Sequence, residues 1–406
     1  MNRSMNRSLM IITIIAMLSI VLAACGTPAP APVATAVSAA KETAAPVAAT
    51  AVSAVKATAA PVATAVAGAT GKPKIGISMS DFATERWKPE SDLLKQLLEA
   101  KGYEVLVQEA NHDVKLQNDQ IDNMLSQGVK GLIIVAEDGD AAATAVQKAN
   151  KAGVKVIAYD RLIKDPAIAG YLSFDNTEVG RNEADGVMKW LDKNFDFSKG
   201  PAKVMMMGGS PTDNNAILVR GGQEEVVKPY IDAGKVEVVA DQWVDNWDAA
   251  NALKIMENVL TAQANKIDAV VASNDGTALG ALQALKAQGL AGKVPISGQD
   301  ATADGCNSIA KGEQTVTVLK DIRNLAPAAV DMMDALIKGE AYSKLKSFTL
   351  AELTNDKTKQ GNIMAYFLPV EQVNKDNVYE KCVKNGFQPY DAVYRDIPDA
   401  QKPPKP

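Results

Sequence analysis

The sequence predicts an α/β protein whose folded body consists of two lobes, each built on a parallel β-sheet. Three observations support this prediction. Apolar runs of about four to six residues alternate with helical patterns of about 10 to 16 residues. Glycines stand where helices are expected to end, at Gly102, Gly128 and Gly153. A second series of the same kind begins near Asn176 and is too long to extend the first sheet.

The first lobe is predicted from alternating strands and helices between residues 74 and 174. The predicted strands are 74–80, 103–109, 131–136, 154–160 and 171–174, and the predicted helices are 86–101, 114–127 and 141–151. Short apolar strands separated by amphipathic helices are typical of a parallel sheet with both faces covered.

The second lobe is predicted from the series that follows Asn176. The predicted strands are 203–207, 236–240, 268–273 and 294–297, and the predicted helices are 178–192, 215–227, 248–262, 277–288 and 304–311. The remainder contains strand 314–319, helix 325–338, the apolar run 365–368 and a short helix 378–384.

The N-terminal segment is typical of an exported protein. Residues 1–24 contain a basic start with Arg3 and Arg7, an apolar run and small residues, which is the pattern of a signal peptide. The run Leu22-Ala23-Ala24-Cys25 is similar to a bacterial lipobox, so Cys25 is expected to be the lipidated first residue of the mature protein. A plain signal peptide with an incidental cysteine is the alternative. Residues 25–72 then form an Ala/Pro-rich tether. The expected location is the outer face of the cytoplasmic membrane.

Composition excludes some classes of partner. The chain has 406 residues and a formal net charge of −5, which becomes −7 when Arg3 and Arg7 leave with the signal peptide. This acidic balance without basic clusters argues against nucleic acid. Besides Cys25 the chain has two cysteines, Cys306 and Cys382. In an exported protein we expect them to form one disulfide, and two buried free thiols are the alternative.

Polar and aromatic residues follow the predicted strands. The segment 241–247 after one strand contains two of the four tryptophans of the chain. Ligands of open parallel α/β sheets bind beyond the carboxyl ends of the strands, so these residues are expected to converge on one site. Carboxylates, amides and Arg match sugar hydroxyls, and Trp rings match the apolar faces of a sugar. The candidates are Asp160, Arg161, Asp213, Asn215, Asn274, Asp300 and Lys320, together with Trp87 and Trp247.

Each candidate has a simpler interpretation. An Asp or Asn that follows a strand, such as Asp213, Asn274 or Asp300, is often the N-cap of the next helix. Trp87 is then a core residue and Lys320 a solvated charge. The recurrence of such residues at several strand ends favours a shared site.

Catalysis and metal binding have little support in the sequence. His112 is the only histidine, so histidine-based catalytic triads and histidine clusters for metals are excluded. Gly208-Gly209-Ser210 lacks the spacing of a phosphate-binding loop. We therefore expect no catalytic residue, no cofactor and no metal.

From residue 74 to about residue 390 the chain resembles the periplasmic sugar-binding proteins of ABC transporters. The resemblance is carried by several stretches, which are Glu85-Arg86-Trp87, Ala158-Tyr159-Asp160-Arg161, Ser173-Phe174-Asp175-Asn176, Met207-Gly208-Gly209-Ser210-Pro211, Asp213-Asn214-Asn215-Ala216, 241–247, 252–258, 266–275 and Ser297-Gly298-Gln299-Asp300.

The resemblance implies the type I binding-protein fold, in which two Rossmann-like, doubly wound lobes are joined by a three-strand hinge and clasp a sugar between them. The implied boundaries are 73–176 with 321–361 for the N-terminal lobe, 177–320 with 362–396 for the C-terminal lobe, and 397–406 for a tail. The implied hydrogen-bonding contacts are Arg86, Asp160, Arg161, Asp213, Asn215, Asn274, Asp300 and Lys320, and Trp87 and Trp247 would sandwich the sugar ring.

The expected ligand is a monosaccharide of pentopyranose size, with D-xylose as the first choice. Two tryptophans cover both faces of one ring, and the charged residues suffice for about four hydroxyls. Arabinose, ribose and glucose are alternatives, as is a receptor that passes the sugar signal to a membrane sensor. The expected protein partners are permease subunits of an ABC transporter, and the protein itself is expected to be a monomer. A sugar-responsive repressor would need an N-terminal helix-turn-helix, where this chain has its tether.

Overall fold

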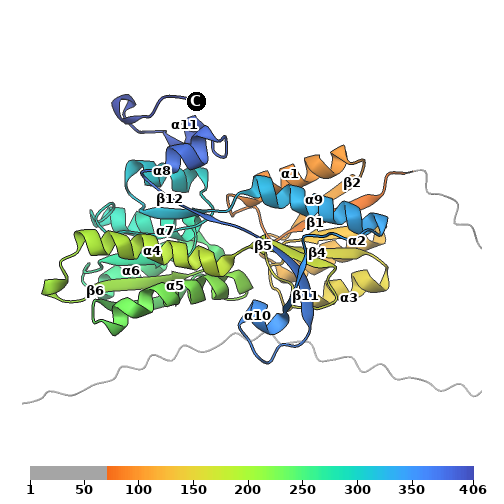
Figure 1. Ribbon diagram of the computed structural model, residues 1–406, viewed down its shortest axis with the longest axis horizontal. Coiled ribbons are helices and arrows are strands. Elements are labelled where there is room, and N and C mark those ends of the chain that lie inside the picture. Colours follow the sequence, from red (N-terminus) through yellow and green to blue (C-terminus); the bar gives the residue numbers. More distant parts are fainter. Residues whose placement is uncertain (1–70) are drawn as a thin grey trace, which may run out of the picture. The chain divides into compact units, whose positions relative to one another are not determined.

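The computed structural model describes residues 71–406, which form two lobes (Figure 1). The predicted signal peptide, Cys25 and the tether up to residue 70 lie outside the described residues. Within the described part, no helix combines the length and apolarity needed to cross a membrane. The predicted α/β architecture is confirmed.

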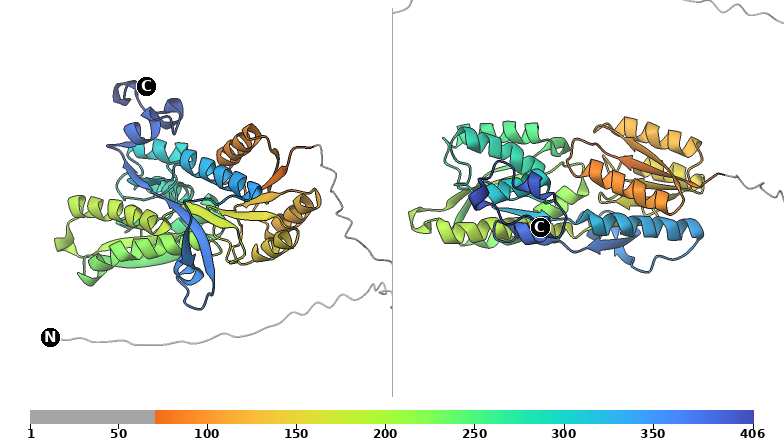
Figure 2. Two further views of the ribbon diagram at one scale, coloured as in Figure 1. Left: turned by 45° about the vertical axis from the view of Figure 1, so that its right-hand side comes forward. Right: turned by 90° about the horizontal axis from the view of Figure 1, so that it is seen from above.

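The N-terminal lobe is built on a seven-stranded sheet with the order β10-β11-β5-β4-β3-β1-β2. Its strands are β1 (Lys74–Met79), β2 (Glu104–Glu109), β3 (Gly131–Ile134), β4 (Lys155–Tyr159), β5 (Gly170–Phe174), β10 (Lys346–Thr349) and β11 (Asn362–Leu368). All neighbouring strands pair in parallel except β10 with β11. The carboxyl ends of the central strands therefore meet at one edge, which faces the second lobe (Figures 1 and 2).

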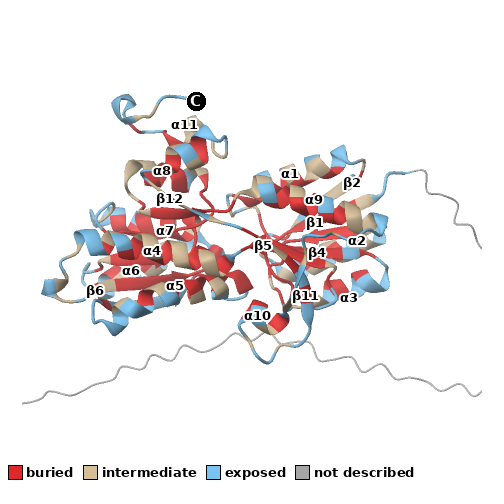
Figure 3. Ribbon diagram, in the orientation of Figure 1, coloured by how far each residue is buried: buried red, intermediate tan, exposed pale blue. Residues whose placement is uncertain are grey.

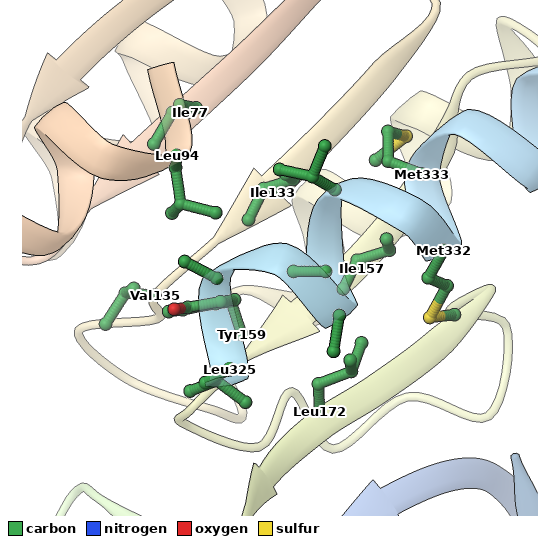
Figure 4. Close-up of a cluster of buried hydrophobic side chains, with 14 of the residues drawn as sticks. Ile77, Leu94, Ile133, Val135, Ile157, Tyr159, Leu172, Leu325, Met332 and Met333 are labelled. Carbon is green, nitrogen blue, oxygen red and sulfur yellow. The ribbon is translucent and has the colours of Figure 1, made fainter. Parts of the chain in front are cut away.

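Helices cover both faces of this sheet. They are α1 (Trp87–Ala100), α2 (Val114–Ser126), α3 (Ala143–Lys151), α9 (Ile322–Lys338) and α10 (Leu350–Thr354). On one face Leu94 of α1 and Leu325 and Met332 of α9 pack with Ile77 and Ile157 of the sheet (Figure 4). On the other face the buried side chains of α2 and α3 form a second core. Each fully buried Leu or Ile contributes about 1.5 to 3 kcal/mol, so this sandwich holds the strand ends rigidly.

The C-terminal lobe has three parallel strands, β7 (Val236–Trp243), β6 (Ala202–Gly208) and β8 (Ala269–Ala272), in the order β7-β6-β8. Its predicted strand 294–297 forms one parallel bridge, Val270 with Ile296. On its other side this segment receives the backbone hydrogen bond from Thr315 N to Ile296 O at 2.9 Å. It thereby connects the three strands to an antiparallel pair, β9 (Val316–Leu319) and β12 (Glu371–Asn374).

Four helices sandwich this sheet, with α4 (Asn176–Asn194) and α5 (Asn214–Asp232) on one face and α6 (Ala249–Ala262) and α7 (Asp275–Ala287) on the other. The buried surfaces of the helices face inward in both lobes (Figure 3). Most helix boundaries agree with the sequence prediction to within a few residues, because the 3.6-residue periodicity is strong.

The chain crosses between the lobes three times. It leaves the first lobe between β5 and α4, returns between β9 and α9, and leaves again between β11 and β12. One predicted boundary was wrong: residues 362–368 were assigned to the C-terminal lobe, whereas β11 pairs in parallel with β5 of the N-terminal sheet, for example Ala365 with Tyr171. An apolar run such as 365–368 fits either sheet, and only its hydrogen-bonding partner decides between them.

The C-terminal segment packs on the short helix α8 (Ala303–Lys311) through the π-helix η3 (Tyr379–Lys384) and α11 (Tyr390–Val393). Cys306 and Cys382 are both fully buried here and are free thiols, so the prediction of a disulfide was wrong. Their close approach and burial raise the pKa of the Cys306 thiol. The predicted tail, 397–406, contains the short helix η4 (Asp399–Gln401) and is held by Tyr390, whose hydroxyl donates to Pro403 O at 2.6 Å.

Candidate ligand-binding site

A narrow cavity of about 20 Å³ lies between the carboxyl ends of the two sheets. The lining consists of Thr84, Arg86, Trp87, Asp160, Arg161, Asp213, Asn215, Trp247, Asn274, Gln299, Asp300 and Lys320. All ten residues expected from the sequence are thus brought together. Their role in binding a sugar stays a prediction.

The lining side chains follow strands of both lobes. In the N-terminal lobe Asp160 and Arg161 follow β4, and Arg86 and Trp87 stand at the start of α1. In the C-terminal lobe Asp213 follows β6 and Asn274 follows β8. Asp160 and Asp300 have positive φ angles of 59° and 92°. Such a backbone costs energy for a residue other than glycine and is typical of functional sites.

Arg86 is held by a carboxylate of its own helix and reaches both lobes. Its Nε donates to Glu90 Oε2 at 2.9 Å, while Nη1 lies 3.0 Å from Asp160 Oδ2. The same Nη1 donates across the cleft to Asp300 Oδ1 at 3.2 Å. Glu90 is fully buried and also accepts a hydrogen bond from Tyr159. The guanidinium is therefore fixed within its own lobe before it contacts the other.

Asp160 lies at the centre of the charge network. Arg86 Nη1 and Lys320 Nζ lie 3.0 and 3.1 Å from its Oδ2, and Asn215 Nδ2 donates to Oδ1 at 3.1 Å. Burial raises the pKa of Asp160, but the charges of Arg86 and Lys320 outweigh burial and bring the pKa to about 2. Asp160 is therefore an ionised acceptor at any physiological pH.

Arg161 and Asp213 form a second link between the lobes. Arg161 Nε lies 3.1 Å from Asp213 Oδ2, and its Nη1 donates to Ala136 O at 3.3 Å within the first lobe. Burial raises the pKa of Asp213, and the charge of Arg161 opposes that rise. Both side chains are about 4% exposed, so their attraction is weakly screened by water.

Two of the acceptors are also helix N-caps. Asp213 Oδ1 accepts a hydrogen bond from Asn215 N at 2.9 Å at the start of α5, and Asn274 Oδ1 accepts one from Thr277 N at 2.8 Å at the start of α7. The capping interpretation and the site interpretation are therefore both correct for these residues. The cap fixes the rotamer that directs the remaining polar atoms into the cavity. Asp300 is not an N-cap, because the cap of α8 is Thr302.

Asn215 connects the hinge with both lobes. Its Oδ1 accepts from Tyr171 Oη at 3.2 Å and from Asn176 Nδ2 at 2.9 Å, and its Nδ2 donates to Asp160. Asn176 is the first residue of α4, directly after the first crossover. A ligand that contacts Asn215 is thus in contact with the hinge.

The two cavity tryptophans are positioned by different means. The guanidinium carbon of Arg86 lies 4.4 Å from the ring centroid of Trp87, whose Nε1 has no hydrogen-bond partner among the described residues. Trp247 lies directly against Gly209, where any Cβ would overlap its ring, and its Nε1 donates to Asp213 Oδ2 at 3.2 Å. Both rings are buried, at 3% and 8% exposure, so they offer apolar faces inside a polar cavity.

Sequence reasoning missed two lining residues, Thr84 and Gln299. Gln299 directly precedes Asp300 at a predicted strand end, so the argument that selected Asp300 applies to Gln299 as well. Its Nε2 donates to Ser273 O at 2.7 Å, whereas its Oε1 has no partner among the described residues and is free to accept from a ligand. Thr84 lies in a loop with no comparable pattern.

One group of side chains has the composition of a metal site. Asp81, His112 and Glu137 offer ligand atoms within 4.8 Å of one another. However, the carboxylates face different ring nitrogens, with Glu137 Oε2 3.3 Å from Nδ1 and Asp81 Oδ1 3.6 Å from Nε2. This is the arrangement of an imidazolium between two anions. The hydrogen bond to Glu137 raises the pKa of His112, burial lowers it, and Asp81 raises it again, with a net increase.

Comparison with known proteins gives a consistent result. Residues 75–341 match the family described as periplasmic binding protein domain. The chain is 45% identical over 322 residues to the D-xylose-binding periplasmic protein of Escherichia coli, covering 79% of this chain and 93% of that protein. It is 36% identical to a multiple sugar-binding periplasmic receptor of Rhizobium radiobacter, with 81% and 94% coverage.

Solved structures agree with this assignment. A solute-binding protein of an ABC transporter from Clostridium phytofermentans with bound β-D-glucose is 31% identical, with a TM-score of 0.70, covering 79% of this chain and 99% of that one. The carbohydrate-transporter protein of Chloroflexus aurantiacus in complex with D-glucose is 27% identical, with a TM-score of 0.68 and coverage of 78% and 97%. The chain described here belongs to the periplasmic binding protein family.

Proposed function

We propose that this protein is the extracytoplasmic solute-binding component of an ABC transporter, which captures a monosaccharide between its lobes and delivers it to a membrane permease. The observation that supports this most strongly is the cavity itself, where two buried tryptophans and a dense set of hydrogen-bonding groups from both lobes surround one small volume. Binding rather than catalysis is the proposed activity.

The proposed ligand is D-xylose. The 45% identical relative from Escherichia coli is named for this sugar, and the cavity lining contains two tryptophan rings that can cover the two faces of one sugar ring. A hydroxymethyl group on C5, as in glucose, would have to displace buried charged side chains from their partners. Leaving such a group unpaired costs about 1 to 3 kcal/mol or more, so discrimination of about tenfold or greater is expected.

Glucose is the second candidate, because two structural neighbours hold it. Calorimetric titration with xylose, glucose, arabinose and ribose tests the proposal. Binding of xylose that is at least about tenfold tighter than binding of glucose supports the first candidate. Heat from glucose but none from xylose would favour the second, and no heat from any sugar would contradict sugar binding altogether.

We also propose that the mature protein begins at a lipidated Cys25 and is a tethered monomer at the outer face of the cytoplasmic membrane. The support is the run Leu22-Ala23-Ala24-Cys25 followed by the Ala/Pro-rich segment. Two or more acyl chains on Cys25 anchor a protein durably, whereas a single acyl chain binds the membrane only reversibly. Fractionation of cells expressing Cys25→Ser tests this: the variant should leave the membrane fraction, and retention there would contradict the anchor.

A further inference from the structure

Glu85 makes a contact between the lobes that lies outside the ligand cavity. It directly precedes Arg86 in the N-terminal lobe but is absent from the cavity lining. Its Oε1 accepts a hydrogen bond at 2.9 Å from Ala303 N, the first residue of α8 in the C-terminal lobe.

The start of α8 suits a carboxylate. The first backbone N–H groups of a helix have no partner within the helix and carry a partial positive charge. The N-cap Thr302 satisfies one of them, accepting from Gly305 N at 3.0 Å. Glu85 satisfies another, that of Ala303, from the opposite lobe, so this N–H group has its partner only when the lobes are together.

The groups around Glu85 shift its pKa in opposite directions. Glu85 is exposed as a whole, but partial burial of its carboxyl group between the lobes raises its pKa, the neighbouring Asp304 raises it further, and the hydrogen bond from Ala303 N lowers it. Asp304 is itself paired with Arg395, whose Nη2 lies 2.6 Å away. The repulsion between the two carboxylates is thereby reduced.

The other charged contacts across the cleft behave differently. Arg86 with Asp300 and Arg161 with Asp213 are pairs of cavity-lining residues, so a bound ligand competes for the same atoms. The Glu85 contact leaves the ligand's hydrogen-bonding groups untouched. It nevertheless joins the same two segments, since Glu85 precedes Arg86 and Ala303 is three residues after Asp300.

We propose that Glu85 is an interlobe latch that prolongs the closed, ligand-loaded state without touching the ligand. This inference rests on the proposed function, sugar capture by lobe closure. Because the latch forms only on closing, it slows sugar release and leaves the encounter of sugar with the open protein unchanged.

The test compares Glu85→Ala and Glu85→Gln with the wild type by stopped-flow tryptophan fluorescence, using the sugar that calorimetry identifies. Loss of a hydrogen-bonded charge is expected to raise the dissociation rate about tenfold in the Ala variant and less in the Gln variant, which keeps an acceptor oxygen. The association rate and the melting temperature without sugar should not change.

Glu352→Gln is the matched control. Glu352 also receives hydrogen bonds at a helix start, from Thr349 N at 2.8 Å at the start of α10, but within one lobe. Its dissociation rate should equal that of the wild type. Wild-type dissociation rates in both Glu85 variants, with sugar binding intact, would overturn the latch alone. Failure of the wild type to bind any sugar would overturn the proposed function and the latch with it.

Discussion

The two walls of the cavity are built in different ways. The N-terminal wall presents two arginines beside the carboxylate of Asp160, and each arginine is held by another carboxylate of its own lobe, Arg86 by Glu90 and Arg161 by Glu137, with Arg161 Nη1 3.5 Å from the latter. The C-terminal wall presents Lys320 and several acceptors, two of which are held by the backbone. Asp213 and Asn274 are N-caps whose orientation is set within three residues of chain.

This difference has a consequence for closure. When the lobes meet, the cations of one wall face the carboxylates of the other, as in Arg86 with Asp300 and Arg161 with Asp213. Each partner keeps a local contact of its own, so opening does not leave a bare charge in the interior. The walls are therefore complementary in charge at these two pairs but are stabilised separately, which fits the lobe closure proposed above.

Removal of a cation from the N-terminal wall should have the largest effect. Arg86→Met removes the cation that pairs with Glu90 and leaves Lys320 as the buried cation beside Asp160 and Asp300, which costs about 3 to 5 kcal/mol of folding or closing free energy. We expect sugar affinity to fall at least about 100-fold, measured by calorimetry, and the denaturation midpoint to fall as well.

The control for this variant is Arg181→Met. Arg181 also pairs with two carboxylates, Glu178 and Glu225, but its side chain is 41% exposed. Surface pairs contribute about 0 to 1 kcal/mol, so stability and affinity should barely change. Equal losses in the two variants would show that burial of the network is unimportant.

A change in the C-terminal wall should separate the two roles of Asp213. Asp213→Asn keeps an oxygen for the cap of α5 but removes the charge that faces Arg161. Affinity should fall about tenfold while stability changes by less than about 1 kcal/mol. In Asp248→Asn, at the cap of α6 outside this cavity, both quantities should stay near wild type. A stability loss in Asp213→Asn as large as its affinity loss would contradict the separation of roles.

The Trp247 position depends on Gly209 in the same wall. Gly209→Ala should displace the ring, because a Cβ there overlaps it, and overpacking costs about 1 to 3 kcal/mol. We expect a several-fold loss of affinity by calorimetry. Gly221→Ala, where a Cβ meets no atom within 4 Å, is the control and should bind sugar normally. Unchanged sugar affinity in Gly209→Ala would contradict the prediction that the position of the Trp247 ring determines binding.

Much of the fold and most of the site follow from local sequence. Asp213 and Asn274 were predictable because a cap follows a strand and precedes a helix within a few residues. Trp243 and Trp247 were not distinguishable in this way, since Trp243 ends a strand and Trp247 lies four residues after it. Trp243 lies 37% exposed beside Arg220, whereas positive φ angles at Asn246 and Trp247 turn Trp247 inward. The partner of β11, the contact of Glu85 with α8 and the carboxylates behind Arg86 and Arg161 depend on tertiary packing that no local pattern encodes.

The smallest expected effect is the pH dependence of folding stability that His112 contributes beside the N-terminal wall. His112 lies between Asp81 and Glu137, and Glu137 in turn faces Arg161. Because the pKa of His112 is raised in the folded state, the protonated ring stabilises the fold fully below the unfolded pKa of about 6.5. That contribution is lost as the pH rises through the folded pKa. Thermal melts of wild type and His112→Gln between about pH 5 and 9 check this.

The difference between the two melting profiles isolates His112 from other groups. Burial raises the pKa of Asp275 to about 7, so this carboxyl group titrates in the same window. Both proteins contain Asp275, and its contribution cancels in the difference. We expect the wild type to be the more stable protein at low pH and the advantage to shrink as pH rises. A difference that stays constant with pH would contradict this prediction. It would mean that the His112 ring is neutral throughout, and Arg161 would then be the cation that faces Glu137.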